Sequence, residues 1–222
     1  MLWNGGIWNW LDAPTAVRAI TELAQRRPGV RLVFMGAAAR EAGDSATERA
    51  RKTAAELDPS GTVVHFNSDW VPYEERATWL AQADCAISTH TAHLESRFAF
   101  RTRALDCFWA GVPIVCSLGD TLADRVEREG LGEVAAPGDA SALAAALEQV
   151  LDRGRAAYAP ALRAAAADYA WPRVAQPLIH WTTSDRRGLG GASGAVPRTA
   201  GHRARTAAYL LGGRLALDRR GG

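Results

Sequence analysis

Short apolar segments alternate with longer amphipathic segments along most of the chain. The short segments are rich in β-branched and aromatic residues, as buried strands are, while the longer ones repeat apolar residues at helical spacing. Regular alternation of this kind is typical of a parallel sheet flanked by helices, so the pattern predicts an α/β fold. The predicted strands are residues 30–35, 63–66, 85–88, 113–116 and 132–135.

Local end signals define the predicted helices between these strands. Asp12 is a suitable N-cap, and Pro14 stands in the first turn of a helix that runs to about Arg26. Gly111 follows another helical segment and is itself followed by Pro113, which indicates a C-cap that leads into the next strand. Further helices are predicted at residues 74–83, 100–110, 121–129, 140–151 and 155–170.

The beginning of the chain departs from the usual α/β pattern. A glycine loop normally follows a complete first strand, whereas here only Met1, Leu2 and Trp3 precede Asn4-Gly5-Gly6. The first strand is therefore predicted to be truncated. We expect one domain over residues 1–183, followed at 184–222 by a flexible Gly- and Arg-rich linker and tail.

Composition is that of a globular protein rather than a membrane-spanning or metal-bound one. Of the 222 residues, 48% are hydrophobic, which is ample for a core. The N-terminal residues lack a signal-peptide pattern, and no segment approaches the roughly 20 apolar residues that span a bilayer, so we expect a cytoplasmic location. Three widely spaced cysteines in apolar surroundings predict buried reduced thiols, and the sequence indicates neither a metal site nor a cofactor.

Charge is distributed unevenly between the domain and the tail. Residues 183–222 carry eight arginines and two aspartates, a net charge of +6, so the remaining chain carries −4 of the total of +2. A basic tail favours an anionic surface, either membrane or nucleic acid. We expect disorder in the tail, with peripheral membrane contact as the alternative role and no nucleic-acid partner.

Two segments carry candidate binding chemistry. Gly5-Gly6 before a helix would let backbone N–H groups approach a phosphate, although on spacing alone a plain tight turn is the simpler explanation of the glycines. The segment His93–Val115 places Glu95, Arg101, Arg103 and Asp106 in a run that otherwise resembles a core helix. A carboxylate there would accept ribose hydroxyls and an arginine would grip a diphosphate, while a structural salt-bridge network is the alternative.

Four ordered blocks resemble the C-terminal, donor-binding domain of GT-B glycosyltransferases of the retaining family 4, or group 1, type. They begin at Gly5, Arg27, Trp70 and His93, and together cover most of residues 1–152. The resemblance implies one Rossmann-like half of a GT-B fold. It also implies a nucleotide-diphosphate-sugar donor, retention at the anomeric carbon and no obligatory metal.

The resemblance also assigns site residues. The ending Ala110-Gly-Val-Pro-Ile-Val matches the end of the family's E-x7-E helix and places Asp106 at the second acid, the ribose contact. Phe98 occupies the position of the first acid, so either an insertion carries Glu95 to the sugar or that contact is lost. Arg101 and Arg103 would replace the family's basic pair at the diphosphate. The donor-site set is completed by Gly5 and Gly6 at the phosphates and by Trp70 and Val71 over the base, although a buried core role for Trp70 is equally open.

The functional hypothesis is a glycosyltransferase that uses a nucleotide-diphosphate sugar and an acceptor that the sequence does not identify. Its N-terminal acceptor domain would lie in a missing part of a longer product or in a partner subunit, or the chain would be a relic without activity. In each case this chain alone is expected to be inactive. For that reason no catalytic residue is assigned. A non-catalytic binding or interaction domain of the same fold is the main alternative, and a nicotinamide dehydrogenase fits less well because its glycine fingerprint is missing.

Overall fold

Six parallel strands form one sheet in the computed structural model, which describes residues 1–36 and 45–183. Their order across the sheet is β3-β2-β1-β4-β5-β6, so β1 and β4 lie side by side in the middle. The predicted α/β class is therefore confirmed, and five of the six strands fall within or beside the predicted segments. The strands are β1 Leu2–Gly6, β2 Leu32–Gly36, β3 Val64–Phe66, β4 Ala86–Ser88, β5 Ile114–Ser117 and β6 Gly132–Ala135.

The first strand differs from the sequence-based prediction. β1 extends through Gly5 and Gly6, is as long as β2, and pairs with it from Leu2 to Gly6. The placement of the two glycines in a loop after the strand was wrong, while the truncation of the first strand stays a prediction. Glycine is uncommon inside strands because it has no side chain to pack, which is why the sequence suggested a turn instead.

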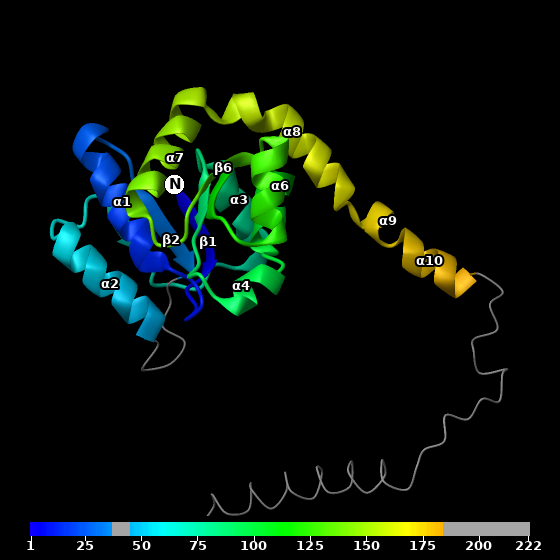
Figure 1. Ribbon diagram of the computed structural model, residues 1–222, viewed down its shortest axis with the longest axis horizontal. Coiled ribbons are helices and arrows are strands. Elements are labelled where there is room, and N and C mark those ends of the chain that lie inside the picture. Colours follow the sequence, from blue (N-terminus) through cyan, green and yellow to red (C-terminus); the bar gives the residue numbers. More distant parts are fainter. Residues whose placement is uncertain (37–44, 184–222) are drawn as a thin grey trace, which may run out of the picture. The chain divides into compact units, whose positions relative to one another are not determined.

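Helices cover both faces of the sheet. Figure 1 shows α1 and α2 on one side of the strands and α3 and α6 on the other. α7 packs against α1, and α5 packs against α3 and α8. The helices of this unit are α1 Ala13–Arg26, α2 Ser45–Leu57, α3 Arg76–Ala81, α4 Leu94–Phe98, α5 Arg103–Ala110, α6 Thr121–Glu129, α7 Ala140–Arg153, α8 Arg155–Asp168 and α9 Trp171–Val174, with a short 3-10 helix η1 at Tyr73–Glu75.

The helix ends have the caps that the sequence predicted. The Asp12 carboxylate accepts the backbone N–H of Thr15 at 3.2 Å at the start of α1. Gly111 ends α5 in the left-handed conformation, with φ of 65°, where glycine is the least strained residue. These caps fix where the chain turns back toward the next strand, and thereby which residues stand at the carboxyl edge of the sheet.

One predicted helix is shorter than expected and has a separate helix before it. The expected helix over residues 100–110 begins only at Arg103, and α4 precedes it. The chain is extended at Ala99, between the two helices, and Arg101 lies in the connecting turn. Consequently Arg101 and Arg103 are not successive positions on one helix and take different partners.

The first residue of α8 connects this helix to the ends of α3 and α5 through several hydrogen bonds. Arg155, its first residue, donates hydrogen bonds to the carbonyls of Ala110 and Gly111 at the end of α5, at 2.6 and 2.8 Å. It also donates to the carbonyls of Ala81 and Ala83, just after α3, at 2.9 and 3.1 Å. A cation at helix C-termini is favourable because it meets unpaired carbonyls and the negative end of the dipole.

The compact unit comprises Met1–Ala175, and the remaining described residues form α10, Gln176–Thr183. α9 and α10 were not expected from the sequence. The predicted linker and tail at 184–222 lie outside the described residues, and the domain boundary at 183 stays a prediction. Among the described residues, no helix is both long enough and apolar enough to cross a bilayer.

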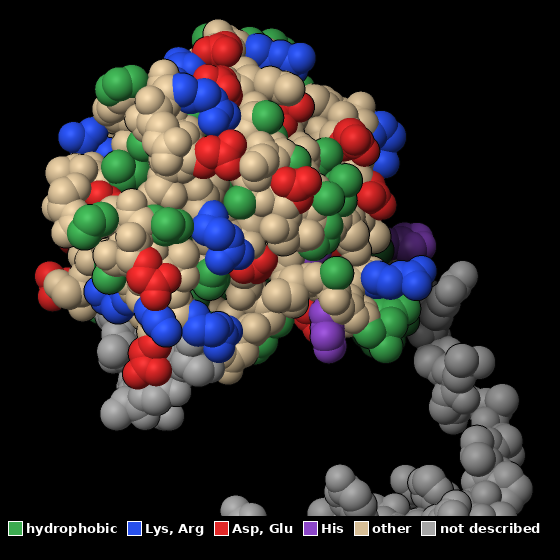
Figure 2. All heavy atoms as spheres, turned by 60° about the vertical axis from the view of Figure 1, so that its left-hand side comes forward, with side chains coloured by type: hydrophobic (Ala, Val, Ile, Leu, Met, Phe, Trp, Pro, Cys, Tyr) green, Lys and Arg blue, Asp and Glu red, His purple; other side chains and the backbone are tan. Residues whose placement is uncertain are grey.

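Buried thiols and a mixed-charge surface agree with a globular domain. Cys85, Cys107 and Cys116 are buried and reduced, as predicted, and burial raises the pKa of the first two thiols to about 12. On the face drawn in Figure 2, acidic and basic side chains are interspersed rather than gathered by sign. That face therefore offers no extended surface of one charge for a polyanion.

Candidate functional site

A cavity of about 310 Å³ opens at the carboxyl edge of the sheet beside β1. The chain crosses to opposite sides of β1 when it forms β2 and β4, and this switch point is where open α/β sheets bind ligands. The cavity is built from the ends of β1 and β2, the start of α2 and the segment that follows β3. Its lining residues are Asn4, Gly5, Gly6, Ile7, Trp8, Met35, Gly36, Thr47, Asp69, Trp70, Val71, Pro72, Tyr73 and Arg76.

Glycines form one wall of the cavity because neighbouring groups leave no room for side chains. A Cβ atom on Gly36 would lie 2.9 Å from the carbonyl group of Gly5, closer than Cβ contacts normally occur. A Cβ on Gly5 would lie 3.2 Å from the guanidinium of Arg103. Gly5 and Gly6 both line the cavity, and their bare backbone allows a ligand to approach closely, while their role at a donor stays a prediction.

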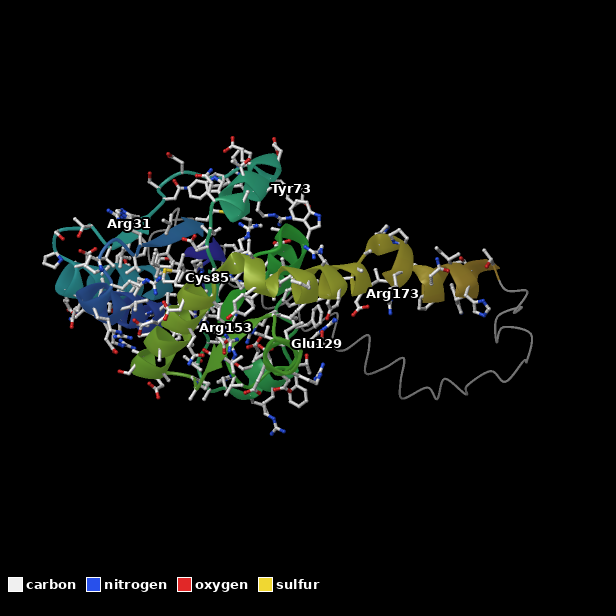
Figure 3. All side chains as sticks on the ribbon, turned by 90° about the horizontal axis from the view of Figure 1, so that it is seen from above. Arg31, Tyr73, Cys85, Glu129, Arg153 and Arg173 are labelled. Atoms are coloured by element: carbon white, nitrogen blue, oxygen red, sulfur yellow. The ribbon has the colours of Figure 1, made fainter. Side chains whose placement is uncertain are left out.

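Aromatic rings surround the cavity. Trp70 and Tyr73 are 72% and 75% exposed, so the alternative of a buried core role for Trp70 is wrong. Figure 3 labels Tyr73 on the η1–α3 segment, at the margin of the domain. Trp8 lines the cavity from the β1–α1 loop and stacks on Trp10 at 5.6 Å between ring centroids. Trp8 was not assigned from the sequence, although two tryptophans, Trp8 and Trp10, follow soon after Gly6.

Asp106 lies beside the cavity through an ion pair with Arg76. Nη1 of Arg76 is 3.2 Å from Oδ2 of Asp106, and the two side chains are 28% and 26% exposed. Burial raises the pKa of Asp106 above its ordinary value, and the nearby guanidinium groups of Arg76 and Arg103 offset only part of this rise. Arg76 was not assigned from the sequence, although it belongs to the block that begins at Trp70.

Arg103 lies behind the glycine wall rather than in the cavity. Its Nη2 donates to the carbonyl oxygen of Gly6 at 3.1 Å, and its own carbonyl accepts from the Asn4 amide at 3.0 Å. Burial lowers the pKa of Arg103 to about 10. Its Nη1 and Oδ1 of Asn4 are both buried without a hydrogen-bond partner among the described residues. Unpaired buried polar atoms are rare in folded proteins.

Glu95 and Arg101 belong to a second group of charges, here named the Asp120 cluster, made of His90, Glu95, Arg101 and Asp120. Arg101 pairs with Glu95 at 3.0 Å and with Asp120 at 3.6 Å, and Nε2 of His90 is 3.5 Å from Asp120. None of these four is among the described residues that line the cavity. The sequence-based alternative of a salt-bridge network thus describes the surroundings of Glu95 and Arg101, and their role at a donor stays a prediction.

Asp120 is held by several partners at the start of α6. Its Oδ1 accepts the backbone N–H groups of Leu122 and Ala123, both at 2.8 Å. Burial raises the pKa of Asp120, but the hydrogen bonds from His90 and from these backbone groups outweigh it and leave the pKa below its ordinary value. The carboxylate is therefore ionised at neutral pH, and it stabilises the fold by capping α6.

Residues 1–153 match the family described as "Glycosyl transferases group 1". The chain belongs to this family. The resemblance drawn from the four sequence blocks is thereby confirmed. No curated protein matches the chain in sequence.

Solved structures share the fold of this group 1 glycosyltransferase domain. WaaG, a glycosyltransferase involved in lipopolysaccharide biosynthesis, superposes with a TM-score of 0.62 at 20% identity over 82% of this chain and 46% of WaaG. HepE from Anabaena, in complex with UDP-glucose, gives 0.62 at 16% identity, with coverage of 80% and 48%.

A third match concerns one domain alone. The C-terminal domain of LpcC, a group 1 family protein from Francisella tularensis, gives a TM-score of 0.56 at 16% identity, with coverage of 72% of this chain and 78% of that one. At these identities the likeness shows the fold, which is Rossmann-like as predicted. The group 1 domain described here spans less than half the length of WaaG and of HepE.

Proposed function

We propose that the cavity binds a nucleotide-diphosphate sugar and that this domain is the donor-binding half of a retaining, metal-independent glycosyltransferase. The observation that carries the proposal is the cavity itself, which combines a bare glycine wall, exposed aromatic rings and a guanidinium at the switch point of the sheet. Membership of the group 1 family supports it. So do the HepE structures, which hold UDP-glucose and UDP.

Each wall of the cavity suits one part of such a ligand. The backbone at Gly5 and Gly6 would admit the diphosphate, and Trp70 would stack on the base above Val71. Asp106 would accept the ribose hydroxyls, as the family resemblance implies. Positive charge near the diphosphate would stabilise it as it leaves, which is the main catalytic contribution available to a donor domain.

Transfer itself requires an acceptor site that these residues do not supply. In the proposed enzyme a second domain or a partner subunit would hold the acceptor against the donor cavity and exclude water. The acceptor, a cytoplasmic location and peripheral membrane contact through residues 184–222 stay predictions. Without the second part, the domain is expected to bind donor but not to turn it over.

Isothermal titration with UDP-, GDP- and dTDP-sugars tests the proposal. We expect one of the three to bind, and we expect Trp70→Ala to weaken that binding about tenfold, because stacking of a base on an aromatic ring contributes ~1–3 kcal/mol. Trp171→Ala is the matched control, since Trp171 is 79% exposed on α9 and does not line the cavity. Absence of heat with all three donors would contradict donor binding by this chain.

A further inference from the structure

Arg76 brings positive charge to the wall of the cavity. Among the described residues that line it, Arg76 is the only one with a basic side chain, and Asp69 is the only acid. It is the first residue of α3 and follows directly on η1, whose Tyr73 ring lies 4.3 Å from its guanidinium carbon. This contact with an aromatic face keeps the cation at the wall of the cavity.

The two arginines that the sequence assigned to the diphosphate have protein partners instead. Arg101 is 11% exposed and is paired with Glu95 and Asp120. Arg103 packs behind Gly5 and donates to the carbonyl of Gly6. To reach a ligand in the cavity, either side chain would have to give up buried contacts, which is costly.

Arg76 differs because it lines the cavity and because its own side chain is 28% exposed, against 11% for that of Arg101. The ion pair with Asp106 is solvent-accessible on both sides, and exposed ion pairs are weak enough to be exchanged. A phosphate group offers the same fork-shaped guanidinium a stronger partner than a carboxylate, with more negative charge and more acceptor oxygens. Exchange would also release the Asp106 carboxylate to accept other donors, such as hydroxyl groups.

We propose that Arg76 is the residue that binds the phosphates of the nucleotide, and that it exchanges Asp106 for the ligand when the nucleotide enters the cavity. This inference rests on the proposed function, whose donor it places in the same cavity. Arg76 thereby takes the role that the sequence assigned to Arg101 and Arg103. Arg76 begins α3, directly after η1. The position of the segment from Trp70 to Tyr73 would therefore depend on whether a diphosphate is bound.

The first test compares a nucleotide with its nucleoside. The best binder among UDP, GDP and dTDP, and the corresponding nucleoside, are titrated into the full chain and its Arg76→Gln, Arg76→Lys and Arg128→Gln variants. We expect Arg76→Gln to weaken the diphosphate at least tenfold more than the nucleoside, and Arg76→Lys to recover part of the loss. Arg128→Gln is the control, because Arg128 is an exposed residue on α6 that pairs with Glu129.

The second test addresses the exchange of partners. Asp106→Asn removes the competing carboxylate, so we expect inorganic pyrophosphate to bind the variant several-fold more tightly than the wild-type chain. Adding Arg76→Gln to Asp106→Asn should abolish this gain. Circular dichroism melting of each variant verifies that it is folded.

The outcomes separate the two proposals. If the wild-type chain binds a nucleotide but Arg76→Gln weakens diphosphate and nucleoside equally, the assignment of Arg76 is wrong and the donor site survives. If Asp106→Asn binds pyrophosphate no better than wild type, the exchange is wrong. If wild type binds no nucleotide and no pyrophosphate, the proposed function and this inference both fall.

Discussion

Asp106 at the cavity and Asp120 in its cluster are both aspartates near helix starts, yet their surroundings shift the carboxyl pKa in opposite directions. Asp120 accepts two backbone N–H groups and has His90 and Arg101 beside it. Asp106 has the ion pair with Arg76 and, among the described residues, no hydrogen bond from a backbone N–H. Burial acts on both, and only Asp120 has directed donors to outweigh it.

This difference distinguishes a carboxylate that stabilises the fold, that of Asp120, from one that is available to a ligand, that of Asp106. A carboxylate held by backbone groups cannot turn to a ligand without uncapping its helix. A carboxylate that is partly desolvated and paired with a movable side chain is stabilised by any additional hydrogen-bond donor, including one from a ligand. Ionisable groups that are partly buried beside a specific charge partner are found more often at binding sites, so the contrast supports the cavity as the functional region.

Removing the Asp120 carboxylate should have the largest effect on stability. We expect Asp120→Ala to lower the free energy of unfolding by about 3 kcal/mol, because it uncaps α6 and leaves the charge of Arg101 poorly compensated. Urea denaturation measures the change. Asp124→Ala, at an exposed position of the same helix, is the control. A loss below about 1 kcal/mol would mean that the Asp120 cluster contributes little to the fold.

Arg155, like Asp120, is bound to backbone groups at helix ends and is expected to stabilise the fold. We expect Arg155→Ala to cost about 2 kcal/mol of unfolding free energy, because carbonyls at the ends of α3 and α5 lose a charged donor. Arg155→Lys should recover only part, since an ammonium lacks the planar fork. The exposed Arg163 on α8 supplies the control variant. Equal stability of Arg155→Ala and Arg163→Ala in urea would refute the structural role.

The parts of the fold that the sequence predicted are those determined by local signals. Alternating apolar segments located five strands, and Asp12 and Gly111 marked helix ends through chemistry that acts within a few residues. β1 was misjudged at Gly5 and Gly6, where strand geometry is imposed by pairing with β2, some 30 residues away in the sequence. Local propensity gives way to tertiary pairing at such positions.

The site was predicted less completely because its contacts join distant segments. Gly5, Gly6, Trp70 and Val71, which the family blocks carry, all line the cavity. The pairing of Arg76 with Asp106 spans 30 residues, and the pairing of Arg101 with Asp120 depends on where α5 begins. Charge and spacing pointed to arginines and carboxylates, but which arginine faces the cavity is decided by the packing of α3 and α5.

The smallest expected effect is the change in unfolding free energy in Asp106→Asn. The pH dependence of this change is the sharpest test of the difference between Asp106 and Asp120. The folded pKa of Asp106 lies above the ordinary value of 3.8, so the folded state binds this proton more tightly than the unfolded chain does. The ionised group therefore destabilises the fold at neutral pH, and this penalty is relieved as pH falls through the folded pKa toward 3.8. Near pH 7 the amide should differ from wild type by less than about 1 kcal/mol, because it loses one weak ion pair and gains relief from desolvation.

The sign of the pH trend distinguishes the two aspartates. The folded pKa of Asp120 lies below 3.8, so its stabilisation is present above that pH and is lost only as pH falls further, through the folded pKa. Urea denaturation from pH 3 to 7 should thus show the unfolding free energy of wild type rising relative to that of Asp106→Asn as pH drops toward 3.8. Relative to Asp120→Asn, the unfolding free energy of wild type should fall as pH drops below 3.8. If Asp106→Asn instead followed the Asp120→Asn curve, Asp106 would be a structural carboxylate like Asp120, and the argument that it is available to a ligand would fail.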